Sequence, residues 1–224
     1  MAGQTAHPPE VIDWFYKFMA RNRNKEMMMR NFVNYIISLW LIISACGGSN
    51  NHNPHIEIQT RLGDIEIELY EKQAPLSVAA FLSYIDSGFY NNSSFYRILN
   101  DDNQPSNAPK SELIQGGIWE ANYKRLDALK GIPHETTDKT KILHKDGVIS
   151  FARQEPGTAK SEFFICVGDQ PGFDFGGENN PDGQGYAAFG RVVKGMEVIT
   201  KIYHAPESDQ YFTPSIPIYK IKRL

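Results

Sequence analysis

The sequence contains little cysteine, little net charge and no long apolar run. Its two cysteines, Cys46 and Cys166, are too few for a disulfide framework. A formal net charge of −3 over 224 residues excludes a nucleic-acid binder that depends on bulk positive charge. The most apolar stretch is shorter than the about 20 residues that a transmembrane helix needs. The 18 glycines and 13 prolines follow no period, which excludes a collagen-like repeat.

What remains is the composition of an ordinary globular protein. Hydrophobic residues make up 41% of the chain and charged residues 22%, which argues against disorder. The charge is unevenly distributed, because residues 1–45 carry five Lys or Arg against three acidic residues. The rest of the chain carries 18 basic and 23 acidic residues, and this division coincides with a targeting signal.

Residues 27–46, MMMRNFVNYIISLWLIISAC, have the features of an export signal. Arg30 supplies a basic n-region, and the short apolar stretch 32–44 suits a signal-peptide h-region. The end of the stretch, Ile43–Cys46, resembles the lipobox of bacterial lipoproteins. This resemblance implies that Cys46 is lipidated and becomes the first mature residue. The alternative is an apolar helix of a folded domain that ends in cysteine.

These features predict the organisation of the N-terminal part. We expect a lipoprotein signal peptide over 27–45 and a flexible polar tether over 46–55. The three consecutive methionines that begin at Met27 predict that translation starts there, so that 1–26 is an extension from a misplaced start. The alternative for 1–26 is a genuine cytoplasmic extension. The expected location is the cell envelope, as a periplasm-facing membrane lipoprotein whose lipid anchor at Cys46 holds it to the membrane.

From residue 56 onward the pattern becomes that of strands. Apolar and polar residues alternate over 56–59 and again over 65–69, which predicts a hairpin with one buried face. Pro75 is then expected to open a helix, because proline suits the first helical position. The apolar stripe of this helix spans 78–85, and Gly88 stands where a helix-ending glycine belongs.

Short apolar runs continue to the end of the chain. They predict strands at 95–99, 113–119, 148–152, 162–167, 186–193 and 216–221. A second short helix is expected near 196–203. Many short strands with two helices fit a mainly β architecture, either a closed barrel or a sandwich. Long loops, which are often functional, are expected at 100–111, 120–146 and 168–185.

Five ordered blocks of sequence point to one family. They are Phe95–Ile98, Ile114–Gly117, Ile149–Arg153, Ser161–Ile165 and Tyr186–Met196. The residues of these blocks and their order along the chain resemble the cyclophilin family of peptidyl-prolyl cis-trans isomerases. The resemblance covers 56–224, and it implies a closed eight-stranded antiparallel β-barrel capped by two α-helices, with a substrate groove on its outer face. It also implies proline-containing polypeptides as partners, no cofactor, no metal and no nucleic acid, and we expect a monomer.

Arg97 is the residue whose chemistry suits this activity. Rotation about an X–Pro amide meets a barrier of about 18–20 kcal/mol, and no bond has to be broken. The catalyst must therefore favour the twisted amide over both planar forms. Twisting frees the lone pair of the proline nitrogen, and a guanidinium is an always-charged donor that can bind it. Without the surrounding blocks, Arg97 is best interpreted as a surface strand arginine.

The resemblance implies roles for further residues, one position at a time. Gln115 is expected to bind the substrate backbone and to help position Arg97, which makes these two the catalytic pair. The other expected substrate-binding residues are Leu113, Ala152, Arg153, Glu162, Phe164 and Tyr186. Among them, Leu113 and Phe164 are expected to hold the proline ring.

The sequence also departs from the family pattern. Glu112 stands where a pocket Phe is usual and Glu162 where Gln is common, so both are expected to add negative charge beside the groove. The segment 100–111 is longer than usual, and it has room to line the groove or to occlude it. These departures favour an alternative function, a non-catalytic proline-peptide binding module or chaperone on the same fold. An inert envelope scaffold is a third possibility.

Other candidate sites are weaker. His134 and His144 lack the spacing of zinc ligands, and solvated loop histidines are the expected interpretation. The oxygen-rich run 174–182 lacks the order of a calcium-binding loop and is interpreted as a glycine-rich turn. Cys166 lies in an apolar strand, which favours a buried, inert thiol.

Overall fold

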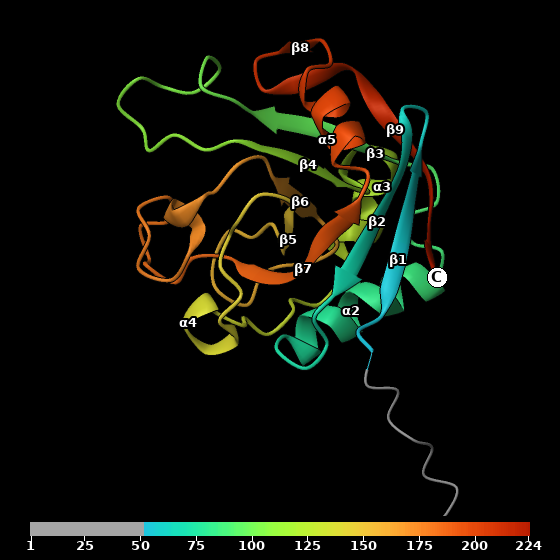
Figure 1. Cartoon of the computed structure of the whole chain (residues 1–224), viewed down its shortest axis with the longest axis horizontal. Helices are drawn as coiled ribbons and strands as arrows, with labels where there is room; N and C mark the ends of the chain where they lie inside the picture. The colour runs from blue at the N-terminus through green and yellow to red at the C-terminus, as the bar shows by residue number, and fades with distance from the viewer. Residues whose placement is uncertain (1–51) are drawn as a thin grey trace, which may run out of the picture. The chain divides into compact units, whose positions relative to one another are not determined.

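The strands of the protein close into a barrel (Figure 1). The computed structural model describes residues 52–224. The predicted extension 1–26, the signal peptide 27–45 and the lipidation site Cys46 lie outside the described residues. Residues 52–224 form one compact unit, and within it no helix is long and apolar enough to span a bilayer.

Eight strands make up the barrel, and all neighbouring pairs are antiparallel. They are β1 (His55–Thr60), β2 (Gly63–Leu69), β7 (Ala187–Lys194), β5 (Val148–Phe151), β6 (Phe163–Cys166), β4 (Leu113–Gly117), β3 (Ser93–Leu99) and β9 (Tyr211–Arg223), in spatial order. Pairing of β9 with β1 closes the sheet. The two-residue strand β8 (Glu207–Ser208) only forms a hairpin with the start of β9. The predicted closed eight-stranded antiparallel barrel is confirmed.

Helices α2 (Pro75–Asp86) and α5 (Met196–Tyr203) lie at opposite ends of the barrel (Figure 1). Pro75 occupies the first turn of α2, and Gly88 follows the end of the helix with a positive φ of 64°. Two further helices, α3 (Trp119–Asp127) and α4 (Thr137–Thr140), lie in the segment that was predicted to be a loop, as a correction to the two-helix prediction. Leu126 is the one buried residue of α3, so this helix has no apolar stripe to detect in the sequence.

Strand β9 is longer than the sequence predicts. The prediction began at residue 216, but the strand begins at Tyr211 and pairs with both β3 and β1. Exposed Tyr211, Thr213 and Pro214 interrupt the apolar alternation at its start, and only Phe212 is buried there. The alternation that identifies a half-buried strand is therefore missing from this stretch.

Phe81 of α2 is fully buried in the barrel core. Its ring contacts four buried aromatic rings, those of Tyr90, Phe151, Phe163 and Phe189, at centroid distances of 5.1–6.0 Å. These partners come from the segment after α2 and from β5, β6 and β7. One helix side chain thus joins three strands of the barrel.

A smaller apolar cluster lies on the outer face of β4 and β6. It consists of Leu113, Phe164, Cys166 and Phe173, with Phe173 supplied by the short 3₁₀ helix η1 (Pro171–Phe173). Cys166 is fully buried and burial raises the pKa of its thiol, which confirms the prediction of a buried thiol.

Buried His144 packs against Phe164 and Phe173 of this cluster. Its ring stacks on Phe164 with an interplanar angle of 15°, and its Nδ1 lies 2.8 Å from an oxygen of Asp174. The backbone N–H of His144 donates to the same oxygen, and Nε2 lies 3.1 Å from the hydroxyl of Ser150. The prediction of a solvated loop histidine is therefore wrong for His144, because the polar groups around it satisfy both ring nitrogens inside the protein.

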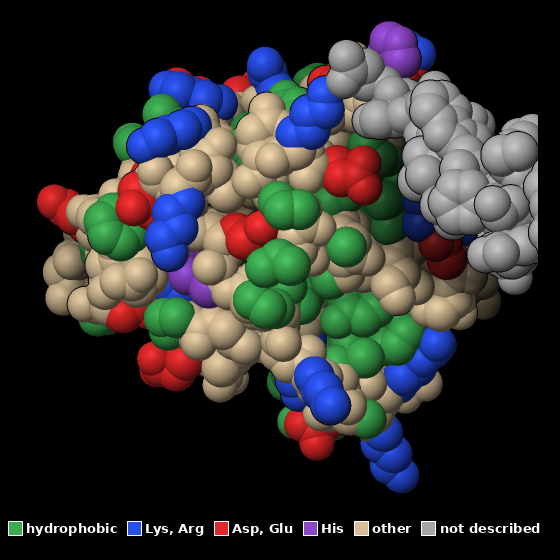
Figure 2. All heavy atoms as spheres, turned by 90° about the horizontal axis from the view of Figure 1, so that it is seen from below, with side chains coloured by type: hydrophobic (Ala, Val, Ile, Leu, Met, Phe, Trp, Pro, Cys, Tyr) green, Lys and Arg blue, Asp and Glu red, His purple; other side chains and the backbone are tan. Residues whose placement is uncertain are grey.

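On the face of the protein shown in Figure 2, Lys and Arg side chains are interspersed with Asp and Glu side chains around a group of hydrophobic ones. This mixture agrees with the small net charge of the chain.

The Phe81→Ala variant should lose about 3–5 kcal/mol of unfolding free energy, because it leaves a cavity among four rings. Leu76→Ala is the matched control, since Leu76 lies on the same helix and is 50% exposed. Its unfolding free energy should stay within about 0.5 kcal/mol of the parent value. Urea denaturation followed by circular dichroism measures both, and equal losses in the two variants would contradict the central role of Phe81.

His144 should make stability depend on pH. Burial lowers the pKa of His144 below its ordinary value, although Asp174 opposes this shift. Below about pH 6.5 the unfolded chain therefore binds a proton that the folded protein does not, and the unfolding free energy falls as the pH decreases. Denaturation between about pH 7.5 and 5.5 should show a weaker fall in His144→Gln than in the parent protein. The same substitution at exposed His204 is the control and should leave the dependence unchanged.

Candidate active site

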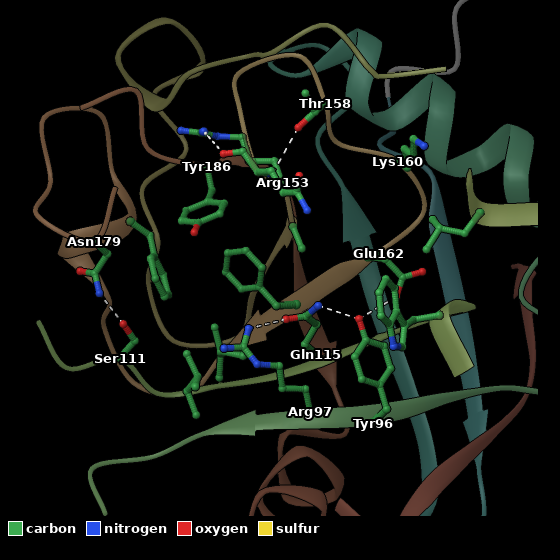
Figure 3. A pocket seen from close by; sticks show the side chains of 18 of the residues that line it. Tyr96, Arg97, Ser111, Gln115, Arg153, Thr158, Lys160, Glu162, Asn179 and Tyr186 are labelled. Carbon is green, nitrogen blue, oxygen red and sulfur yellow. Dashed lines mark hydrogen bonds between the residues drawn. The ribbon is translucent and has the colours of Figure 1, made fainter. Parts of the chain in front are cut away.

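A β-bulge at Tyr96 positions the polar residues of the site. On β3, Phe95 pairs with Gly116 and Arg97 pairs with Gln115, so Tyr96 has no partner of its own on β4. Phe95 and Ile98 are both fully buried in the core although they are three residues apart. Regular alternation would turn one of them outward, and the extra residue removes this conflict. The bulge therefore lets Tyr96 and Arg97 both face the outside of the barrel, where Gln115 lies (Figure 3).

Gly116 makes the bulge sterically feasible. A Cβ atom at this position would lie 2.9 Å from the ring of Phe95 and 2.9 Å from the carbonyl oxygen of Ser94. The glycine of the Gln-Gly-Gly block is thus explained by close packing against the bulged strand.

The guanidinium of Arg97 is held by two neutral amides. One terminal nitrogen donates to Gln115 Oε1 at 3.1 Å, and the other donates to Gln210 Oε1 at 2.9 Å. Because both partners are uncharged, they orient the guanidinium without neutralising it. The predicted pairing of Arg97 and Gln115 is thus present in the geometry.

Sequence reasoning missed Gln210. This residue and Asp209 form the two-residue connection between β8 and β9, and both have positive φ angles, 71° and 54°. Such angles are those of a tight hairpin turn that matches the twist of the strands. Gln210 Nε2 donates to the carbonyl oxygen of Asn103 at 3.0 Å, which leaves its Oε1 for Arg97. In the sequence the turn is marked only by Asp209, a residue type that tolerates positive φ. Gln210 itself lies 113 residues from Arg97.

Apolar residues form the floor of the site, and all of them except Phe173 are among the predicted substrate-binding residues. Phe164, Phe173 and Tyr186 contact one another at centroid distances of 5.2–5.3 Å, with Leu113 and Ala152 packed beside them. Together with Arg97 and Gln115 they line a groove of about 790 Å³. The structure therefore brings together all the predicted site residues of the described part of the chain.

Arg153 acts within the protein rather than toward the groove. Its side chain is only 1% exposed, and it forms two hydrogen bonds with Asp182 and two with the carbonyl oxygen of Gly185. The bonds to Asp182 from Arg153 and from the backbone N–H of Gln184 lower the pKa of Asp182 to about 2. Arg153 also lies over the ring of Tyr186, at 5.3 Å from its centroid. It thus fixes the loop that carries Tyr186, and only its backbone remains for a substrate.

The two unusual glutamates differ in their relation to the groove: Glu162 lies beside it as predicted, whereas Glu112 does not line it. Glu112 accepts a hydrogen bond from the hydroxyl of Tyr203 in α5 and does not line the groove. Glu162 lines the groove but is only 8% exposed, and its carboxylate accepts from Tyr96 and from the backbone N–H of Ile118. Buried Glu162 needs such partners to replace its lost hydration, and half-buried Glu112 is held by its bond to Tyr203.

The longer segment 100–111 lines one end of the groove. Gln104 donates to the carbonyl oxygens of Asn100 and Ser111, which ties the segment back on itself. Gln104, Pro109 and Ser111 contribute to the groove wall, while Trp119 and Tyr123 of α3 line it as well. Of the two possibilities raised by the sequence, lining and occlusion, the structure shows lining.

The oxygen-rich run 174–182 is engaged by protein partners. Asp174 pairs with His144 and Asp182 pairs with Arg153, which agrees with the interpretation of a structural turn. Within residues 52–224 no group of three or more His, Cys, Asp or Glu side chains is arranged to hold a metal ion.

Comparison with known proteins identifies the family. Residues 55–223 match the family of cyclophilin type peptidyl-prolyl cis-trans isomerases. A peptidyl-prolyl cis-trans isomerase of Acinetobacter baylyi is 35% identical over 171 residues, which cover 76% of this chain and 82% of the relative. Peptidyl-prolyl cis-trans isomerase B of Escherichia coli is 36% identical over 148 residues, or 66% of this chain and 82% of the relative.

Solved structures support the fold. The crystal structure of a Cryptosporidium parvum cyclophilin type peptidyl-prolyl cis-trans isomerase aligns with a TM-score of 0.60 and 22% identity. The alignment covers 77% of this chain and 98% of that protein. The groove, the bulged arginine strand and the family match lead to one conclusion: this chain belongs to the cyclophilin family and is a peptidyl-prolyl cis-trans isomerase.

Proposed function

We propose that this isomerase assists the folding of exported polypeptides from a lipid-anchored position in the bacterial cell envelope, and that Arg97 is its catalytic residue. The observation that carries the catalytic part is the guanidinium of Arg97, oriented by two neutral amides beside an apolar pocket. A charge that is held but not neutralised remains able to bind a substrate group.

The proposed chemistry follows from the electronic structure of the amide. In the planar X–Pro bond the nitrogen lone pair is delocalised into the carbonyl group and accepts no hydrogen bond. As the bond twists, the lone pair localises on the nitrogen, and Arg97 then donates to it. This interaction exists only near the transition state, so it lowers the barrier rather than merely tightening binding. A hydrogen bond to a charged group contributes about 1.5–3 kcal/mol.

The apolar floor would hold the proline ring while the carbonyl end rotates. Leu113, Phe164 and Phe173 are buried, and Tyr186 closes the group as a fourth apolar surface. Gln115 keeps one N–H for the substrate backbone, because its other contacts go to Arg97 and Tyr96. Anchoring one side of the bond in this way supplies the remaining part of the acceleration through orientation.

The exported location rests on the N-terminal sequence. The basic n-region, the short apolar stretch and Ile43–Cys46 follow the order of a lipoprotein signal. Bacterial isomerases are among the relatives, which agrees with a bacterial lipid anchor. Unfolded polypeptides that reach the periplasm contain X–Pro bonds in both isomers, and their slow isomerisation limits folding.

The alternative of a non-catalytic binding module depended on two features. These were the charges of Glu112 and Glu162 beside the groove and a segment 100–111 that blocks it. Because both carboxylates are engaged internally and the segment lines the groove, neither feature favours that alternative.

The Arg97→Ala variant of the full chain should lose about 10- to 100-fold in kcat/KM toward a proline-containing tetrapeptide, since it lacks the charged hydrogen bond. Peptide binding should change little, because the apolar pocket is intact. Arg191→Ala is the matched control, as Arg191 is an exposed arginine on β7. A variant as active as the parent protein would refute the role of Arg97, and equal loss in the control would indicate general damage.

The anchor is tested separately. Protein extracted from bacterial membranes should begin at Cys46 and carry the added mass of lipid, as measured by intact-mass spectrometry. The Cys46→Ser variant should appear in the soluble fraction or keep its signal segment, because no thiol is present for lipidation. An unmodified Cys46 or an uncleaved chain in the membrane fraction would overturn the lipoprotein assignment without affecting the isomerase activity.

A further inference from the structure

A buried carboxylate beside a catalytic arginine calls for an explanation. Glu162 is 8% exposed, and it lies on the same side of the barrel as Arg97 without touching it (Figure 3). Removing a carboxylate from water is unfavourable unless hydrogen bonds replace the lost hydration. Its partners therefore indicate what it does.

We propose that Glu162 and Tyr96 are positioning residues, which determine the direction in which the Gln115 amide faces and thereby hold Arg97 in its catalytic position. This inference rests on the isomerase activity and on the proposed role of Arg97.

A continuous chain of hydrogen bonds joins the four side chains. The hydroxyl of Tyr96 donates to Glu162 Oε2 at 2.8 Å, and its oxygen accepts from Gln115 Nε2 at 2.6 Å. Gln115 Oε1 then accepts from Arg97 at 3.1 Å. Every donor in this chain points toward Glu162. Dashed lines in Figure 3 mark the bonds.

The direction of the chain is determined by its two ends. Arg97 has only donors, so it requires the oxygen of the Gln115 amide. The amide nitrogen must then face Tyr96, which has to accept with its oxygen. The single proton of the Tyr96 hydroxyl consequently needs an acceptor elsewhere, and Glu162 supplies it. If Tyr96 donated to Gln115 instead, the amide would turn its nitrogen toward Arg97, and two donors would face each other.

The chemistry at position 162 favours a carboxylate over a carboxamide. Oε1 of Glu162 accepts from the backbone N–H of Ile118 at 2.8 Å, while Oε2 accepts from Tyr96. Two donors on opposite oxygens require two acceptor atoms. A glutamine has one acceptor oxygen, so it satisfies either Ile118 or Tyr96 and presents an NH₂ group to the other. A glutamine that kept the Ile118 bond would reverse the direction of the chain.

The environment keeps the protons in the required places. Burial and the neighbouring Glu162 carboxylate raise the pKa of Tyr96, so its phenol remains a donor at neutral pH. Burial also raises the pKa of Glu162, whereas its hydrogen bonds from Tyr96, Ile118 and Ser161 favour the ionised form. The bulge at Tyr96 places the phenol between Gln115 and Glu162, so the irregularity of β3 serves the chain directly.

Two substitutions test the proposal in the full chain. Tyr96→Phe removes the link, and Glu162→Gln removes the second acceptor. Each should lower kcat by about 10- to 100-fold with little change in KM, because Arg97 is displaced while the apolar pocket remains. Tyr90→Phe is the matched control, since Tyr90 is a buried tyrosine whose hydroxyl donates to the backbone of neighbouring Ser161, outside the chain of bonds. It should retain the parent kcat.

Combination with Arg97→Ala separates positioning from general structural damage. If Tyr96 and Glu162 act through Arg97, either substitution should cause little further loss of kcat in the Arg97→Ala background. Additive losses in the double variants would overturn the proposal, as would single variants as active as the Tyr90→Phe control. Because the two single substitutions differ in chemistry, failure of one to fold leaves the other as the test.

A measurement without substrate distinguishes this proposal from the isomerase assignment. The side-chain NH₂ signals of Gln115 in a ¹⁵N-labelled protein report its bond to Tyr96. They should shift and exchange faster with solvent in Tyr96→Phe and Glu162→Gln, but not in Tyr90→Phe. If these signals were unchanged in both variants, the proposal would fail even with an active enzyme. If they changed as expected while the parent protein lacked activity, the isomerase assignment would fail, although the chain of hydrogen bonds from Glu162 to Gln115 would be present.

Discussion

The β-bulge at Tyr96 is the constraint on which the site depends. It turns Tyr96 and Arg97 to the outside of the barrel while Phe95 and Ile98 remain in the core. Without the extra residue, strand alternation would force a choice between a packed core and an outward-facing arginine. The close approach of Gly116 to Phe95 is part of the same arrangement, because a side chain there would collide with the bulged strand.

The bulge brings Arg97 to a place where its charge is oriented but not cancelled. Amide oxygens of Gln115 and Gln210 hold the guanidinium from two separate segments, while the carboxylate of Glu162 is kept at a distance by two intervening side chains. A carboxylate in direct contact would position an arginine equally well but would weaken its ability to stabilise a developing charge. Because Glu162 acts through the neutral side chains of Tyr96 and Gln115, the guanidinium of Arg97 is firmly oriented and its positive charge remains available.

Polar pairs around the groove support it in the same manner. Arg153 with Asp182 fixes the loop before Tyr186, and His144 with Asp174 fixes the segment that carries Phe173. His144 also stacks on the back of Phe164, so the apolar floor has a polar support behind it. These four titratable side chains lie beside a binding groove, yet each is paired within the protein and serves to hold the groove in place.

The sequence alone determined the fold class and most of the site. Alternation in β1 and β2 and the stripe of α2 predicted a barrel or a sandwich. The family resemblance carried by the five ordered blocks implied the closed barrel and the roles of Arg97, Gln115 and Phe164. These features are local, because periodicity and motif order are properties of neighbouring residues. Helix α3 was not predicted because it buries a single residue. The start of β9 was not predicted because it lacks the alternation of apolar and polar residues.

The tertiary structure decided what the charged and polar residues do. The family resemblance implied that Glu112 and Glu162 add charge beside the groove, and the loop position of His144 suggested a solvated ring. Hydrogen bonds within the protein engage all three side chains. Gln210 joined the site from 113 residues away through a turn with no apolar pattern. Apolar residues follow a periodicity that the sequence displays. The role of a buried polar side chain depends instead on which partner the folded chain brings within about 3 Å, and that is a property of tertiary structure alone.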